Sequence, residues 1–145
     1  MSAPRATKIL IPVGGEFNKA SLLRSLQLFS GTAEARLVLL HVIALPQTVS
    51  IEGAALGSLR ENTENRFRTT AQWLTEQGLS AELRIAGARS IVDGIVEEAE
   101  SGDYKLIVIQ KTKKSGMAKV GNIVKRSTSE RLLNLTSVPL LIIPP

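Results

Sequence analysis

The densest group of chemically active side chains is a basic segment from Lys111 to Arg126. It holds six of the 18 lysines and arginines and no acidic residue, so 12 basic and 13 acidic residues remain elsewhere. This basic segment therefore accounts for the net charge of +5. Its cations are Lys111, Lys113, Lys114, Lys119, Lys125 and Arg126.

Two interpretations of the basic segment stay open. In the first, the segment binds an anion, which is a nucleotide, an acidic partner or a lipid surface. In the second, it is a solvated loop that only keeps the protein soluble. Nucleic acid is disfavoured as a partner, because the cations are not interleaved with aromatic residues and no reading helix is evident.

Two other reactive side chains have structural explanations. His41 is the only histidine and stands inside an apolar run, which indicates a hydrogen-bonded core residue and not a catalytic base. Ser127 precedes Glu130 by three residues, which is the spacing of a helix N-cap. The same helix end could also receive a phosphate group.

Metal and enzyme signatures are missing from the sequence. Glu97, Glu98 and Glu100 have no histidine or aspartate at metal-binding spacing, so we expect them to form a solvated helix face. A P-loop, a zinc signature and a nucleophile elbow are also absent. We therefore expect no catalytic residue, no metal site and no enzymatic activity.

Composition indicates one α/β domain over residues 1–145. The length suits a single domain, and the aromatic share of 3% means that leucine, isoleucine, valine and alanine must build the core. Such aliphatic packing suits a parallel sheet that is buried on both faces. The sequence has no cysteine, no signal-peptide pattern and no run long enough to span a bilayer, so we expect a cytoplasmic protein.

Apolar runs alternate with segments of helical periodicity, which predicts five strands separated by helices. The strands are expected at Lys8–Val13, Arg36–Ile43, Ala81–Ala86, Leu106–Ile109 and Val138–Ile143. The helices are expected from Asn18 to Gly31, from Leu59 to Gln77, from Ser90 and from Ser127. This alternation implies parallel strands joined by right-handed crossovers, and hence a three-layer, doubly wound sheet. Ligands of such sheets bind at the carboxyl ends of the strands.

Helical spacing also predicts which side chains each helix buries. The expected inner positions are Leu22, Leu26 and Phe29, then Phe67, Ala71 and Leu74, and then Ile91, Ile95 and Ala99. Trp73 is expected to pack beside the second of these groups and not to stack on a nucleobase.

Several segments together resemble the universal stress proteins. They are Lys8–Val13, Val38–Val42, Leu106–Ile109, Ser127–Leu133 and Ser137–Ile143. The resemblance covers nearly the whole chain and is carried by the order and spacing of the segments. It implies the strand order 3-2-1-4-5 and a homodimer through the last strand, Val138–Ile143. The family has members that bind ATP and members that do not.

The sequence departs from the motif of the ATP-binding members. That motif has a glycine, two residues, a second glycine, nine residues, and then a glycine before serine or threonine. Counted back from Ser127, these places hold Lys113, Gly116 and Arg126, and another register puts Gln110 and Lys113 at the two first glycines. The acidic residue that usually follows the first strand is Gly14 here.

The resemblance and the strand ends define a candidate nucleotide crevice. Its expected residues are Pro12, Val13, Gly14, Val42, Gln110, Lys113, Gly116, Arg126, Ser127 and Thr128. Lysine and arginine side chains need volume where backbone amides should approach a phosphate.

The first hypothesis is a stress-response or regulatory binding protein that does not bind ATP in the family's usual way, with no cofactor expected. A second is a protein that binds ATP or another adenine nucleotide, with Lys113, Lys114 or Arg126 at the phosphates. A third, from the resemblance alone, is a cytoplasmic accessory of a membrane transporter.

Overall fold

The computed structural model describes residues 7–14, 18–27, 35–45, 54–111 and 128–145 of the chain. Within these residues, strands and helices alternate in the predicted order. The strands are β1 (Thr7–Pro12), β2 (Ala35–Ala44), β3 (Ser80–Ala88), β4 (Leu106–Gln110) and β5 (Leu140–Ile143). The helices are α1 (Lys19–Leu26), α2 (Ala54–Glu76), α3 (Ile91–Ser101) and α4 (Thr128–Leu135).

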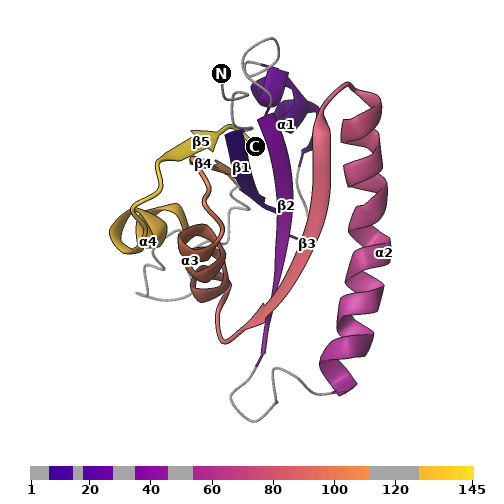
Figure 1. Ribbon diagram of the computed structural model, residues 1–145, viewed down its shortest axis with the longest axis vertical. Coiled ribbons are helices and arrows are strands. Elements are labelled where there is room, and N and C mark those ends of the chain that lie inside the picture. Colours follow the sequence, from indigo (N-terminus) through magenta and orange to yellow (C-terminus); the bar gives the residue numbers. More distant parts are fainter. Residues whose placement is uncertain (1–6, 15–17, 28–34, 46–53, 112–127) are drawn as a thin grey trace, which may run out of the picture.

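The five strands form one parallel sheet in the order β3-β2-β1-β4-β5. β1 lies in the middle, with Ile9 opposite Leu37 of β2 and Leu106 of β4. Figure 1 shows α2 on one side of the sheet and α3 with α4 on the other. The predicted three-layer, doubly wound fold and its strand order are therefore confirmed.

Side chains of the sheet alternate between two aliphatic core layers. Ile9 and Ile11 of β1 pack on the side of α1 and α2, whereas Leu10 packs on the side of α3 and α4. None of these three side chains is more than 2% exposed. The predicted inner residues of α2, which are Phe67, Ala71 and Leu74, are buried, and Trp73 packs against the same layer as expected.

The boundaries of β3, α2 and β5 differ from the prediction by two residues or more. β3 extends beyond the predicted Ala81–Ala86, because Gly87 and Ala88 continue its pairing with β2. α2 begins at Ala54, ahead of the predicted Leu59, since alanine favours helix and an exposed glycine is tolerated there. β5 begins at Leu140 and not at Val138, because the intervening proline has no amide hydrogen to give to a ladder.

The buried face of α3 was predicted wrongly at one position. Ile91 is 53% exposed, whereas its neighbour Val92 is only 2% exposed and packs with Ile95 and Ala99. The Ser90 side chain accepts a hydrogen bond from Asp93 N and caps the helix as expected. The buried residues of α3 are Val92, Gly94, Ile95, Glu98 and Ala99, and Ile91 lies outside this stripe. The predicted Phe29 and Gly31 lie outside the described residues.

Gly94 brings α3 into close contact with β2. A Cβ atom added at Gly94 would lie 2.5 Å and 2.8 Å from the two γ-carbons of Val42, and Val42 is only 6% exposed. A side chain at this position would therefore force the helix away from the sheet.

We expect Gly94→Ala to lower the free energy of unfolding by about 1–3 kcal/mol, because the added methyl group overpacks the contact with Val42. The matched control is Gly57→Ala in α2, where an added Cβ meets no atom within 4 Å. That control should gain about 0.5–1 kcal/mol from helix propensity. Urea unfolding followed by circular dichroism measures both, and equal effects of the two changes would contradict the packing argument.

Candidate functional site

The predicted crevice residues that the structure describes lie at the carboxyl ends of β1, β2 and β4. Pro12 is the last residue of β1, and the amide of the buried Val13 donates to the Leu40 carbonyl at 2.8 Å. His41 Nδ1 donates to the Val13 carbonyl at 3.0 Å, and its ring stacks on Phe67 with 4.9 Å between centroids. His41 is thus the hydrogen-bonded packing residue that the sequence indicated.

Gly14 follows β1 at an exposed position. A Cβ atom added there would meet no other atom within 4 Å. There is therefore room at this position for the acidic residue that is usual in the family that the chain resembles, where this chain has glycine.

Gln110, the last residue of β4, is bound at both ends of its side-chain amide. Its Oε1 accepts a hydrogen bond from Asn18 N at 2.8 Å, and its Nε2 donates to the Asn18 carbonyl at 3.0 Å. Asn18 is the N-cap of α1, where its Oδ1 accepts from Ser21 N. We call this pair of bonds the Gln110 clamp. It ties the end of β4 to the start of α1.

The remaining predicted residues are not all brought together. Val42 packs in the core layer beneath α3 and α4, whereas Gln110 bonds to the start of α1 on the other side of the sheet. Thr128 is exposed at the first position of α4. Four predicted residues lie outside the described part of the chain, namely Lys113, Gly116, Arg126 and Ser127.

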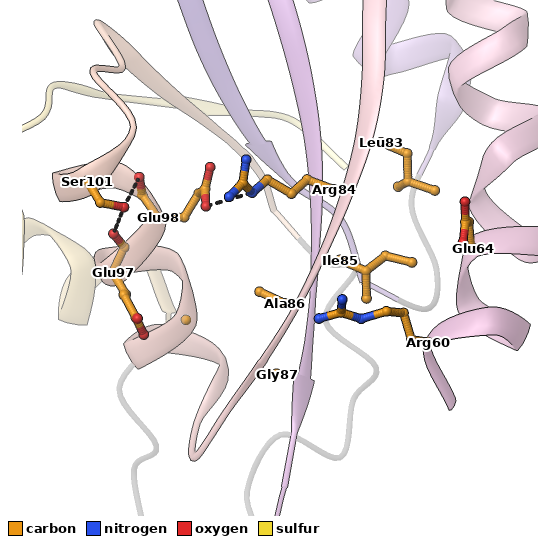
Figure 2. Close-up of a pocket in the computed structure, with 11 residues that line it drawn as sticks. Arg60, Glu64, Leu83, Arg84, Ile85, Ala86, Gly87, Glu97, Glu98 and Ser101 are labelled. Carbon is orange, nitrogen blue, oxygen red and sulfur yellow. Dashed lines mark hydrogen bonds and ion pairs between the residues drawn. The ribbon is translucent and has the colours of Figure 1, made fainter. Parts of the chain in front are cut away.

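The acidic residues of α3 are a correction to the sequence analysis, because Glu98 is not solvated. It is 7% exposed, and its Oε1 lies 2.9 Å from Arg84 Nε of β3. Tyr104 donates its hydroxyl to Glu98 Oε2 at 2.6 Å. Burial and this acidic neighbour raise the pKa of Tyr104 above its usual value, so the hydroxyl keeps its proton. Figure 2 shows Arg84 and Glu98 joined across the space between β3 and α3.

Glu100 also departs from the expectation, because its carboxylate accepts hydrogen bonds from another part of the chain. Its Oε1 accepts hydrogen bonds from Thr136 Oγ1 at 2.8 Å and from Ser137 N at 3.0 Å, in the connection between α4 and β5. These donors lower the pKa of Glu100 below its usual value. Neither contact leaves a pattern in the sequence, because the partners are far apart along the chain.

Two properties of the described residues bear on ligand and membrane chemistry. No group of three or more His, Asp or Glu side chains among them is arranged to hold a metal ion. None of the helices in this part of the chain is both long and apolar enough to cross a membrane.

A doubly wound parallel sheet places the carboxyl ends of its strands at one edge, which is where ligands of such sheets bind. The sequence profile of the universal stress protein family matches residues 6–144. The chain belongs to this family. A search among proteins with curated descriptions finds no match to the sequence.

Solved structures of the family have the same fold. The hypothetical protein MJ0577 superimposes with a TM-score of 0.73 at 22% identity and covers 96% of both chains. A universal stress protein from Burkholderia pseudomallei gives 0.68 at 22% identity over 99% of this chain and 100% of its own. The universal stress protein from Archaeoglobus fulgidus, solved in complex with dAMP, gives 0.65 at 16% identity over 94% and 97%.

We expect Gln110→Glu to lower the free energy of unfolding by about 1–2 kcal/mol, because a carboxylate cannot donate to the Asn18 carbonyl and would face it with a charged oxygen. The control is Gln77→Glu, which places the same charge at an exposed position after α2. Its effect should stay below about 0.5 kcal/mol. Chemical unfolding at neutral pH tests the pair, and an unchanged midpoint for Gln110→Glu would show that the clamp contributes no stability.

Proposed function

We propose that this universal stress protein is a stress-response or regulatory binding module that does not take ATP in the usual pose of its family, and that it binds without catalysing a reaction. The observation that carries the proposal is the Gln110 clamp. Both polar atoms of the Gln110 amide are used by Asn18, at distances of 2.8 Å and 3.0 Å. In one register, Gln110 stands at the first glycine of the family's phosphate-binding motif. Its side chain therefore stabilises the fold and is not available to a phosphate.

Two features of the sequence support the same proposal. The family's phosphate motif has Lys113 and Arg126 at two of its glycine positions, and their side chains occupy space that the backbone needs to approach a phosphate. At the other end of the crevice, Gly14 supplies no carboxylate for a ribose. Both ends of a nucleotide would therefore lose their usual contacts.

A second candidate function is binding of an adenine nucleotide through the basic segment. The dAMP complex of the Archaeoglobus fulgidus protein favours this candidate, since it shows that this fold can hold an adenine nucleotide. Lysine and arginine bind phosphate by charge, without the close backbone approach that glycine permits. In this alternative, Lys113 and Lys114 would take over the phosphate contacts.

Thermal unfolding with and without ATP separates the two candidates. We expect no rise in Tm for the natural sequence, whereas a ligand at about 100 times its Kd would stabilise by about 2.7 kcal/mol. Combining Gly14→Asp, Lys113→Gly and Arg126→Gly should create an ATP-dependent rise, and adding Gln110→Ala should increase it. A rise in the natural sequence that Lys113→Glu with Lys114→Glu abolishes would favour the second candidate. A rise that survives this charge reversal would contradict both.

The proposed module is a homodimer that pairs through β5. β5 is at the edge of the sheet, and it has no second neighbouring strand among the described residues. Its Ile142 is 42% exposed, and Leu133 and Leu135 of the adjacent α4 are 60% and 54% exposed. An open strand edge flanked by apolar side chains suits pairing with an identical edge.

We expect Ile142→Lys to convert the dimer to a monomer, because it places two cations in a symmetric apolar contact. Ile91→Lys is the matched control, since Ile91 is 53% exposed on α3, away from β5. Sedimentation velocity should give a dimer for the natural sequence and the control. A monomeric natural protein, or loss of the dimer in the control alone, would refute pairing through β5.

A further inference from the structure

The opposite edge of the sheet, formed by β3, is longer and differs in chemistry. β3 spans nine residues and pairs only with β2 within the described part of the chain. The carbonyl of Ala88 points toward β2, where it accepts a hydrogen bond from Leu45 N at 2.8 Å. Because the backbone groups of successive residues in a strand alternate in direction, those of Leu83, Ile85 and Gly87 point to the open edge.

A groove follows this edge. One hollow of about 670 Å³ borders Leu83 to Gly87 and reaches α3, and a second of about 690 Å³ borders Ala81 to Leu83 along α2. Leu83 of β3 and Glu64 of α2 line both hollows, so the two lie next to each other along β3. We call the combined hollow the β3 groove. Figure 2 shows the part that reaches α3, with β3 between Glu64 and Arg60 of α2 and the acidic residues of α3.

The charged side chain of Arg84, in the middle of β3, points toward α3 (Figure 2) and does not block the open edge. Proteins commonly block an open edge strand with a lysine or another charge that an incoming strand would have to bury. Arg84 is the cation in the middle of β3, but its guanidinium is held against α3 by Glu98 at 2.9 Å. Tyr104 fixes the other oxygen of Glu98 at 2.6 Å. The edge is therefore left accessible by a network built from three separate elements.

The two walls of the β3 groove differ. On the α2 side, Leu83 and Ile85 present half-buried apolar side chains next to three charged residues of α2, which are Arg60 and the ion pair of Glu64 with Arg68. On the α3 side, Glu82 and Glu97 are exposed, and neither makes an ion pair within the described residues, whereas the charge of Arg84 is offset by Glu98. The α2 side thus offers the apolar side chains of β3 beside charged groups of α2, and the α3 side offers the exposed carboxylates of Glu82 and Glu97.

We propose that the β3 groove binds an extended segment of a partner protein, in which apolar residues alternate with lysine or arginine, as a sixth strand of the sheet. Side chains of an added strand point alternately to the two faces, so its apolar residues meet the α2 wall and its cations meet Glu82 and Glu97. At about 3.3 Å per residue, a segment of about seven residues spans the groove from Ala81 to Gly87. This proposal does not depend on what the crevice at the carboxyl ends binds.

The test uses two fluorescent nine-residue peptides with blocked ends, one alternating valine with lysine and the other alternating valine with glutamate. Fluorescence anisotropy should show saturable binding of the lysine peptide and binding at least about tenfold weaker for the glutamate peptide. Binding of the lysine peptide should weaken as salt is raised, because the acidic residues of the groove are exposed. Equal affinity for both peptides, or no binding of either, would overturn the proposal.

Two pairs of variants locate the binding. Ile85→Pro removes an outward-facing amide without breaking the pairing with β2, and should weaken binding by roughly tenfold or more. Ile85→Ala is its control, because it loses the same side chain but keeps the amide, and it should bind more tightly than the proline variant. Glu82→Gln with Glu97→Gln should weaken binding roughly three- to tenfold, whereas Glu61→Gln with Glu130→Gln should not.

Circular dichroism and the unfolding midpoint must show that each variant is folded before its affinity is compared. If the folded Ile85→Pro variant binds the lysine peptide as well as Ile85→Ala does, the peptide does not pair with β3 and the proposal is wrong. If instead Ile85→Pro reduces the mass of the free protein in sedimentation, β3 pairs two copies of this chain. That result would replace the partner segment with self-association.

Discussion

Burial of β1 on both faces is the constraint on which the rest of the structure depends. Ile9, Leu10 and Ile11 are successive residues, and each is 2% exposed or less. Three consecutive buried side chains require a layer of helices on each side of the strand, and parallel pairing on both edges places β2 and β4 beside β1, with Pro12 opposite Leu40 of β2. The crevice, its clamp and both sheet edges follow from that placement.

The Gln110 clamp shows how polar groups at a strand end can serve either a ligand or the fold. A backbone amide at the start of a helix is an orphan donor that a phosphate can satisfy. Here the amide of Asn18 is satisfied by Gln110 Oε1, and the Asn18 carbonyl accepts from both Leu22 N and Gln110 Nε2. A ligand that bound to these groups would have to displace hydrogen bonds that the protein already makes. The net free energy of its binding would therefore be small.

The sequence predicted most of the fold because the central strands are continuous apolar runs, which have few alternative explanations. Prediction from the sequence was weaker where neighbouring residues fit the same helical pattern equally well. Ile91 and Val92 both suit a helical stripe, and the choice between them depends on how α3 packs on the sheet, where Gly94 approaches Val42. It could not find the Gln110 clamp, whose partners are 92 residues apart, or the pairing of Glu98 with Arg84 on another element. Such contacts depend on the complete fold and leave no periodic pattern.

One helix connects the three regions that matter for binding. Gly94 of α3 lies against Val42 near the carboxyl end of β2, and Glu98, one turn later, holds Arg84 away from the edge of β3. Glu100 binds the connection that leads into β5. A shift of α3 would therefore alter the contact with β2, the accessibility of the β3 groove and the start of β5 together.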